Sequence, residues 1–346
     1  MAFQLPVVAS TVRAGRVAIE RASARLVRVS LTDRCDMACV YCRPSRAEGY
    51  LAAEDRLDVD AWEAVLRGLY ARGVRRVRLT GGEPLLFKDV VSMVRRIAAL
   101  GFDDLAMTTH GAHLAPLAKT LREAGLRRLT ISLDTLDPAR FSAITRGGDF
   151  DAVIAGVEAA RAAGFDELKT NTVVLRGEND ESLEAMVRWA WARQITPRFI
   201  EVMGVGEGGK IWRDKLVSMA EQRRRLGHLL VDREATRDPD RGPAKYLFAR
   251  DGSGARVGFI SGSTDTYCGG CDRLRASSDG TLRPCLATAD AVGFAAPLRE
   301  AMREGDDTDA VIAEALDAAW AMKPDAQWQG CTEVSARGVS MRAIGG

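Results

Sequence analysis

Short β-branched runs alternate with longer amphipathic runs over the first two thirds of the chain, and this alternation limits the possible folds most strongly. The expected strands cover residues 24–32, 75–80, 103–109, 126–134, 167–175 and 196–203. The expected helices cover residues 59–73, 88–100, 113–124, 151–164 and 182–193. Strands that alternate with helices in this way form a parallel sheet with right-handed crossovers. Six such units are too few for an eight-stranded barrel, so we predict an α/β fold, a partial (β/α)6 TIM-like barrel.

The alternation stops after residue 204, which indicates a second structural unit. The stretch GVGEGGK at residues 204–210 is expected to be a flexible loop. Two helices and a hairpin are expected beyond it, at residues 215–230, 297–320 and 246–260. We therefore predict a barrel domain over residues 1–204 and a C-terminal domain over residues 205–346.

The charge balance limits the classes of partner. The 346 residues include 49 Lys and Arg and 47 Asp and Glu, a formal net charge of +2. This balance argues against a general affinity for nucleic acid or for a membrane surface. The sequence has no apolar run of the roughly 18–20 residues that cross a bilayer, and its start does not resemble a secretory signal. A cytoplasmic location is expected.

Three cysteines follow the first expected strand in a C-x3-C-x2-C pattern, namely Cys35, Cys39 and Cys42. Three thiolates on one short loop can hold three irons of a [4Fe–4S] cluster and leave the fourth iron open to another ligand. A structural zinc site is the alternative, and such a site usually has a fourth Cys or His nearby. No histidine precedes His110, although a distant fourth ligand stays possible.

A second trio, Cys268, Cys271 and Cys285, has the pattern C-x2-C-x13-C. A zinc ribbon would need a second CxxC pair, and a redox pair would leave Cys285 unexplained. The trio therefore favours a second cluster with one open iron. Arg273 and Arg275 follow Cys271, and arginines at such a site can pair with a polyanionic ligand. A solvated basic strand is the alternative interpretation.

Several motifs resemble those of known enzymes. The first trio and the stretch TGGEP at residues 80–84 resemble the cysteine and Gly-Gly-Glu motifs of the radical S-adenosylmethionine (SAM) superfamily. Further stretches resemble the GTP 3',8-cyclase family of that superfamily, in the same order along the chain. They are VRVSLTDRCDMACVYCRP, VRLTGGEPLL, ISLDTLD, KTNTVVLRGEND, FIEVMGVGEG, FISGSTDTYCGGCDRLRASSDGTLRPCLA and the final Gly345-Gly346.

The resemblance implies SAM and two [4Fe–4S] clusters as cofactors, one on each cysteine trio. It implies that SAM is contacted by Tyr41, Gly82, Glu83, Ser132 and Met203. It implies that GTP is contacted by Arg28, Arg78, Thr108, Lys169, Arg273, Leu274 and Arg275. Gly345 and Gly346 would reach into the catalytic site as a narrow tail.

The resemblance also implies a reaction. Reductive cleavage of SAM would give a 5'-deoxyadenosyl radical that removes hydrogen from ribose carbon 3' of GTP. Attack on guanine carbon 8 would then give 3',8-cyclo-7,8-dihydro-GTP, the first step of molybdenum cofactor biosynthesis. The implied partners are an external electron donor, the cyclic pyranopterin monophosphate synthase that takes the product, and a second copy of the chain in a homodimer.

A few positions depart from the family pattern. His110 and Asp272 stand where the family usually has Asn, and Arg342 stands where it usually has Ser. Cys331 matches no cluster position and is interpreted as a small buried apolar residue. Two alternative functions stay open, a peptide-modifying radical SAM maturase and a non-catalytic zinc-binding scaffold.

Overall fold

The computed structural model describes residues 24–44, 49–231, 242–268, 271–324, 341 and 343–345, together with the backbone of two short strands, β1 (Val7–Val8) and β8 (Thr236–Arg237). Cys331, Arg342 and Gly346 lie outside the described residues. The interpretation of Cys331 and the consequence of Arg342 therefore stay predictions.

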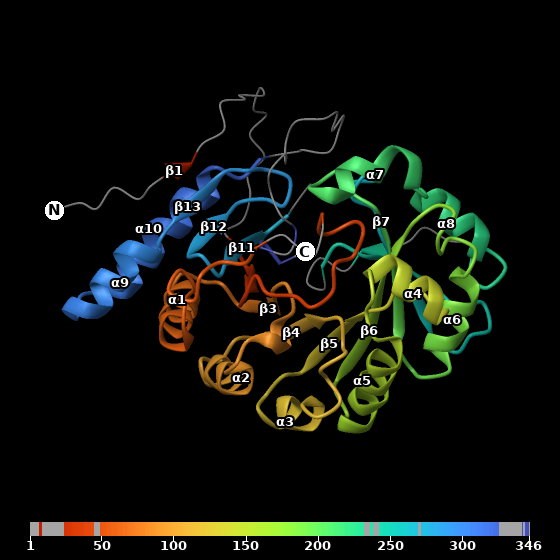
Figure 1. Cartoon of the computed structure of the whole chain (residues 1–346), viewed down its shortest axis with the longest axis horizontal. Helices are drawn as coiled ribbons and strands as arrows, with labels where there is room; N and C mark the ends of the chain where they lie inside the picture. Colours follow the sequence, from red (N-terminus) through yellow and green to blue (C-terminus); the bar gives the residue numbers. More distant parts are fainter. Residues whose placement is uncertain are drawn as a thin grey trace.

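Six parallel strands form the centre of the molecule and confirm the predicted alternation. In order they are β2 (Leu26–Ser30), β3 (Arg76–Thr80), β4 (Asp104–Thr109), β5 (Arg128–Ser132), β6 (Glu167–Val174) and β7 (Thr196–Glu201). Each strand pairs in parallel with the next one, and the sheet curves without closing, as Figure 1 shows. The prediction of an open, partial barrel is therefore confirmed.

Helices cover the outer side of this sheet (Figure 1). They are α1 (Val59–Ala71), α2 (Val90–Ala99), α3 (Ala118–Glu123), α5 (Phe150–Ala163) and α6 (Leu183–Trp191). Another helix, α4 (Pro138–Thr145), ends at the loop that follows β2, where Val40 N donates to the Ile144 carbonyl at 3.0 Å. Helix α4 was not predicted, and Asp137 starts it by accepting hydrogen bonds from Ala139 N and Arg140 N. A continuous apolar core fills the space between sheet and helices, with Trp62, Leu79 and Ile97 fully buried in it.

The C-terminal part of the chain extends both edges of the barrel sheet. Strand β10 (Arg256–Ile260) pairs in parallel with β7, and β11 (Arg273–Ser277) pairs in parallel with β2. The predicted hairpin is confirmed, because β9 (Lys245–Phe248) pairs antiparallel with β10. Strands β12 (Thr281–Arg283) and β13 (Ala291–Gly293) continue the other edge beyond β11.

The helices of the C-terminal part differ from the prediction in two places. The predicted loop at residues 204–210 is wrong from Glu207 onward, where α7 (Glu207–Lys215) begins. Gly208 packs so closely there that a Cβ would lie 2.5 Å from the Met203 carbonyl oxygen, so the glycine serves packing inside a helix. The single helix predicted at 297–320 is instead α9 (Ala295–Glu304) and α10 (Thr308–Ala321), separated at Gly305 with φ of 77°.

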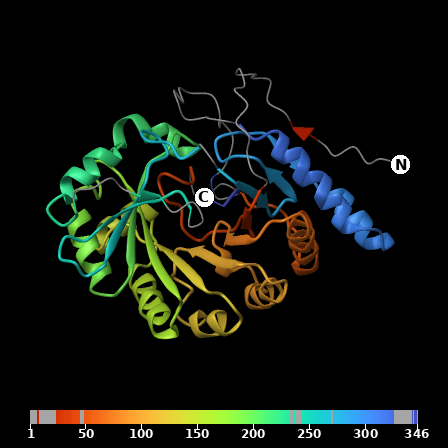
Figure 2. The same ribbon diagram turned by 180° about the vertical axis from the view of Figure 1, so that it is seen from behind.

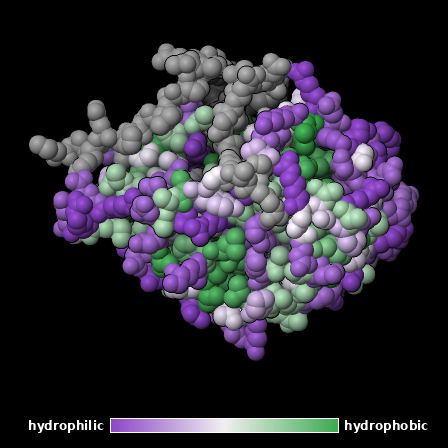
Figure 3. Space-filling model, in the orientation of Figure 1, coloured by the Kyte–Doolittle hydropathy of each residue, from purple (hydrophilic) through white to green (hydrophobic). Residues whose placement is uncertain are grey.

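The remaining helices complete the outer layer. Helix α8 (Met219–Leu226) is shorter than predicted and begins at Ser218, whose side chain accepts a hydrogen bond from Glu221 N. Helix α10 lies along α1, as Figures 1 and 2 both show. Hydrophilic residues predominate along the rim of the face in Figure 3. Among the described residues, no helix combines the length and apolar character that a bilayer crossing requires.

Candidate active site

The first cysteine trio lies on the loop that follows β2. Cys35 and Cys39 pack against the apolar core, and Cys42 N donates a hydrogen bond to the Cys39 carbonyl, 2.9 Å away. Burial raises the pKa of the Cys39 thiol well above its ordinary value, and the negative charges of Asp134, Cys42 and Cys35 raise it further. Three thiols that repel one another as thiolates are stabilised by a bound cation. The trio therefore fits the three cysteine-ligated irons of a [4Fe–4S] cluster.

The Gly-Gly-Glu turn after β3 packs directly against this cysteine loop. Gly82 N donates to the Thr32 carbonyl and Glu83 N donates to the Arg34 carbonyl, both at 2.7 Å. A Cβ on Gly82 would lie 2.6 Å from the Arg34 carbonyl carbon, closer than real Cβ contacts occur. Glycine is therefore required for this close approach of the two loops.

Glu83 is fully buried and ties β3 to β4. Its carboxylate accepts hydrogen bonds from Thr109 Oγ1 at 2.6 Å, His110 N at 2.8 Å and Leu85 N at 3.0 Å. These three donors all belong to the protein, so the carboxylate already fixes the geometry of the turn. A contact between Glu83 and SAM stays a prediction.

Tyr41 is held by a residue that the sequence analysis did not single out. Its hydroxyl donates to Asp134 Oδ2 at 2.6 Å, and Val173 N donates to Asp134 Oδ1 at 2.9 Å. Burial raises the pKa of Asp134 to about 6, although both hydrogen bonds lower it. Asp134 stands in the ISLDTLD stretch two residues after Ser132, so its place in that stretch was an available signal.

The residues expected to contact SAM gather at one edge of the barrel. Ser132 ends β5, and Met203 follows β7, so both lie at the carboxyl ends of strands together with the cysteine loop and the Gly-Gly-Glu turn. Met203 is closely surrounded, because a Cβ on Gly262 would lie 2.7 Å from its sulfur. The Tyr267 hydroxyl lies 3.9 Å from the same sulfur.

The second cysteine trio lies where the C-terminal part joins β2. Cys268 and Cys285 pack against the same small apolar cluster, and burial raises the pKa of Cys285, to which the negative charges of Cys271 and Cys268 add. Burial raises the pKa of Cys271 too, but Arg273 and Lys323 lower it to about 7 overall. Ala287 N and Arg273 Nε donate to Cys285 Sγ and Cys271 Sγ, each at 3.4 Å. Thiolates that receive such donors fit a second cluster.

The two trios lie at opposite ends of one strand pair. Cys35 follows the carboxyl end of β2, whereas Cys271 precedes the amino end of β11, which is parallel to β2. A strand of five residues, the length of both, spans roughly 17 Å. A ligand that meets both trios must therefore extend along the barrel interior.

Glu201 anchors the segment that leads to the second trio. This carboxylate, 1% exposed at the end of β7, accepts hydrogen bonds from Ser261 Oγ at 2.8 Å and from the backbone nitrogens of Ser263 and Thr264 at 3.0 Å. Met219 N and the Thr264 hydroxyl also donate to it. Glu201 was not predictable from the sequence, since an acidic residue at the end of a strand carries no distinctive pattern.

Three arginines form a row across neighbouring strands inside the barrel. Arg275 is in register with Arg28, and Arg28 is in register with Arg78. Burial, followed by the charges of Arg275, Arg78 and Arg273, lowers the pKa of Arg28 well below its ordinary value. Burial also lowers the pKa values of Arg78 and Arg275 to about 10. A row of neighbouring buried cations is unfavourable unless an anion lies against it.

More cations line the barrel beyond this row. Lys169, 3% exposed on β6, forms an ion pair with Glu167 at 2.6 Å. Arg198, 2% exposed on β7, donates to Thr130 Oγ1 at 3.1 Å and leaves its buried Nε without a hydrogen-bond partner among the described residues. Thr108 is in register with Thr130 on the neighbouring strand. Arg198 was missed because one arginine in a strand is usually interpreted as a surface charge.

The C-terminal tail enters this cationic interior. The Gly345 carbonyl accepts hydrogen bonds from Arg28 Nη2 at 3.1 Å and from Arg275 Nη1 at 2.5 Å. The Ile344 carbonyl accepts a second bond from Arg275, at 3.0 Å. Gly345 therefore lies beside two of the residues expected to bind GTP.

Leu274 and Asp272, which flank Arg273 after Cys271, make structural contacts within the protein. The Leu274 side chain is 1% exposed and packs in the apolar core, so only its backbone is available to a ligand in the barrel. Asp272 pairs with Arg76 of β3, and its carbonyl accepts hydrogen bonds from Arg25 N and Leu26 N. Asp272 therefore fastens the start of β11 to the barrel.

Comparisons with known proteins agree with this arrangement. The profile of the Radical SAM superfamily matches residues 29–190, and the profile Molybdenum Cofactor Synthesis C matches residues 195–328. A GTP 3',8-cyclase of Rhodopseudomonas palustris (strain TIE-1) is 40% identical over 304 residues, which cover 86% of this chain and 85% of that protein. A GTP 3',8-cyclase of Marinobacter nauticus is 40% identical over 302 residues, covering 86% and 89%.

A solved structure shares the fold at low sequence identity. SuiB of Streptococcus suis bound to S-adenosylmethionine superimposes with a TM-score of 0.57 at 19% identity, over 77% of this chain and 61% of that one. The chain thus spans about three fifths of the length of SuiB, and the likeness concerns the fold alone.

Proposed function

Because the chain belongs to the GTP 3',8-cyclase family of radical SAM enzymes, we propose that its barrel converts GTP to 3',8-cyclo-7,8-dihydro-GTP, the first step of molybdenum cofactor biosynthesis. Its cofactors are SAM and [4Fe–4S] clusters. The cluster and SAM together supply a 5'-deoxyadenosyl radical when both are bound. The rest of the reaction depends on how the protein holds SAM and GTP next to each other.

The observation that carries this proposal is the row formed by Arg275, Arg28 and Arg78 between the two cysteine trios. The charges of the buried Arg78 and the half-buried Arg28 and Arg275 repel one another, and a triphosphate would offset that repulsion. The trios mark the two ends of the same strand pair, so a bound nucleotide can reach from one to the other. A nucleotide triphosphate therefore matches the positive charge of this interior.

The SAM pocket is proposed at the carboxyl ends of the strands. Cys35, Cys39 and Cys42 would ligate the cluster there. The surrounding contacts would come from Tyr41, Gly82, Glu83, Ser132 and Met203. Asp134 supports Tyr41 through its 2.6 Å hydrogen bond and would thereby hold that ring in place.

The GTP pocket is proposed deeper in the barrel. The triphosphate would be bound by Arg28, Arg78, Lys169 and, in addition, Arg198, with Thr108 nearby. Arg273, Arg275 and the backbone of Leu274 would bind from β11, next to the cluster held by Cys268, Cys271 and Cys285. Gly345, with Gly346 beyond it, would lie along the substrate without filling the space that the ribose needs.

The partners beyond GTP are proposed from the chemistry of the reaction. An external electron donor must supply the electron that cleaves SAM. The cyclised product would pass to cyclic pyranopterin monophosphate synthase, and the chain would act as a homodimer. Thiol ligands persist in reducing compartments, which supports a cytoplasmic location.

The test is an anaerobic reaction of the reconstituted protein with GTP, SAM and a strong reductant, analysed for the cyclised product. We expect 5'-deoxyadenosine and 3',8-cyclo-7,8-dihydro-GTP to form together, and neither to form efficiently without GTP. A protein that holds both clusters but forms no product would contradict the proposal. A peptide-modifying enzyme would leave GTP unbound, so a GTP-binding measurement separates that alternative.

A further inference from the structure

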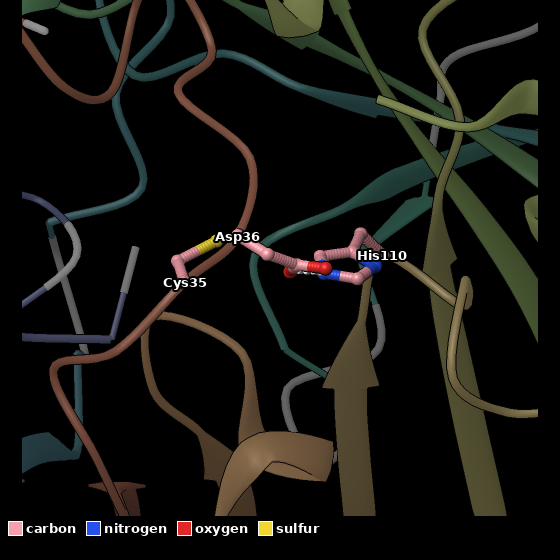
Figure 4. A group of neighbouring side chains, drawn as sticks. All are labelled: Cys35, Asp36 and His110. Carbon is pink, nitrogen blue, oxygen red and sulfur yellow. Dashed lines mark hydrogen bonds and ion pairs between the residues drawn. The ribbon is translucent and has the colours of Figure 1, made fainter. Parts of the chain in front are cut away.

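His110 connects the two loops that surround the first cysteine trio. Its backbone nitrogen donates to Glu83 Oε2 at 2.8 Å, and its ring Nε2 lies 3.3 Å from the same oxygen. The ring Nε2 also lies 2.8 Å from Asp36 Oδ1, in the cysteine loop. Figure 4 shows the Asp36 side chain directed toward the imidazole. His110 therefore bridges the Gly-Gly-Glu turn and the cysteine loop.

The imidazole also lies beside a cluster ligand. The Cys35 sulfur, a carboxylate oxygen of Asp36 and a ring nitrogen of His110 all lie within 4.8 Å of one another. His110 is buried, with 8% of its surface exposed. Few water molecules can therefore screen the interaction of this ring with the thiolate.

The hydrogen bonds assign the ring proton to the side that faces the cluster. Ala112 N donates to His110 Nδ1 at 3.2 Å, so Nδ1 is the acceptor and Nε2 carries the proton. The Nε2–H group therefore faces Asp36, Glu83 and Cys35. This group forms its hydrogen bond with Asp36 Oδ1, while Glu83 Oε2 and the Cys35 sulfur lie close to the same imidazole.

Asp36 provides an internal comparison. His110 bonds its Oδ1, and His113 bonds its Oδ2, each at 2.8 Å. The His113 side chain is 41% exposed, whereas that of His110 is 9% exposed. The Asp36 carboxylate thus hydrogen-bonds to a buried histidine, His110, and to a solvent-exposed histidine, His113.

We propose that His110 is a positioning residue that orients Cys35 and raises the reduction potential of the cluster held by Cys35, Cys39 and Cys42. Reduction makes a cluster more negative, and a donor beside a ligating sulfur stabilises the reduced state. The Asp36 charge has the opposite effect, and the Nε2–H group offsets it. The inference depends on the proposed function only in that a cluster is bound at this trio.

The test is a redox titration of the reconstituted full chain, followed by electron paramagnetic resonance. The SAM-binding cluster is identified as the one whose signal changes when SAM is added. In His110→Ala we expect the equilibrium constant for reduction of this cluster to fall at least tenfold, which is 59 mV for a one-electron couple. His110→Gln places an amide donor near the position of Nε2. The equilibrium constant for reduction of the cluster in this variant should therefore stay within threefold of the wild-type value.

His113→Ala is the matched control, because it removes the other donor to Asp36 from the solvated side. In His113→Ala we expect the equilibrium constant for reduction of the cluster to change by less than threefold. An unchanged potential in His110→Ala, or equal shifts in His110→Ala and His110→Gln, would overturn the proposal. If His110→Ala does not retain the cluster, His110→Asn is the second variant. Its side chain is too short to reach Asp36, so it should lower the potential like Ala, and an unchanged potential in it would equally overturn the proposal.

The titration contains no GTP. Its outcome is therefore independent of the cyclisation reaction, and a failure of one proposal can be distinguished from a failure of the other. Iron content measured on each variant shows whether the compared proteins hold the same cluster.

Discussion

Gly345 packs against Thr80 with no space between them. A methyl group on Gly345 would overlap the threonine hydroxyl and lie 3.1 Å from its Cβ. Gly345 also has φ of 71°, in the left-handed region that favours glycine. Both the space and the backbone conformation therefore require glycine where the tail meets β3.

Gly345→Ala should displace the tail from Arg28 and Arg275. We expect product formation to fall at least about tenfold while the SAM-responsive cluster is retained, since Ile344 of the tail belongs to the small apolar cluster against which Cys268 and Cys285 of the second trio pack. Product yield per cluster is the measurement. Gly227→Ala is the control, because Gly227 has right-handed helical geometry and a Cβ there would make ordinary contacts. Equal activity of Gly345→Ala and the control would contradict the role of the tail.

Arg198→Ala should weaken GTP binding without affecting the clusters. A hydrogen bond to a charged group contributes about 1.5–3 kcal/mol, which corresponds to a loss of affinity of about 10- to 100-fold. Equilibrium binding of GTP to the reconstituted protein measures this. Arg95→Ala, on the exposed side of α2, should leave the affinity unchanged. A normal affinity in Arg198→Ala would remove Arg198 from the proposed triphosphate site.

Lys169 should make GTP binding depend on pH. Burial, together with Arg198 and Arg78, lowers the pKa of Lys169 to about 7, although Glu167 raises it. The ammonium form binds phosphate, and above pH 7 the neutral amine predominates in the protein without GTP. The affinity should therefore decrease as the pH rises from 7 to 9, by up to about tenfold per unit.

Lys169→Arg is the matched variant for this prediction, because a guanidinium stays charged throughout that range. Its affinity for GTP should vary less with pH than that of the wild type. Parallel pH profiles for the two proteins would show that another group causes the dependence.

Glu201→Gln should release the segment that leads to Cys268. An amide offers a donor where the carboxylate oxygens accept several hydrogen bonds, so we expect a loss of about 2–4 kcal/mol in the free energy of unfolding. The second cluster should be lost more readily than the first, as measured by iron content and by the SAM-responsive signal. Glu314→Gln, at an exposed position of α10, is the control. Retention of both clusters with wild-type stability would contradict the anchoring role.

Single cysteine replacements test the assignment of two separate clusters. Cys35→Ala and Cys285→Ala should each lose about half of the roughly eight irons of the loaded protein. Cys35→Ala should also lose the response to SAM, whereas Cys285→Ala should keep it. A single replacement that removes all iron would indicate one shared site.

The barrel was predictable because its signal is periodic. Val27 and Val29 face the apolar core, while Arg28 between them faces the barrel interior. Apolar and polar residues alternate in this way in successive strands that are separated by helices. Few folds other than a curved parallel sheet covered by helices are compatible with this pattern. Helix α7 was not predictable in the same way, because glycines such as Gly208 usually break helices and only the contact with Met203 explains this one.

The ligand residues were predictable from spacing, but the residues that support them were not. The cysteine trios are patterns along the chain. By contrast, Asp134, Arg198 and Glu201 act through neighbours distant in the sequence, such as Tyr41, Thr130 and Ser261. Their roles depend on which strands pack side by side, and a short sequence pattern does not contain that information.

The most direct measurement of the proposed reaction uses GTP that carries deuterium at ribose carbon 3'. After anaerobic reaction with SAM and reductant, the 5'-deoxyadenosine is analysed by mass spectrometry. If the barrel holds that carbon against the SAM site, one deuterium atom will appear in 5'-deoxyadenosine and the cyclised product will lack it. Unlabelled 5'-deoxyadenosine, with deuterium retained in the nucleotide, would contradict the proposed function.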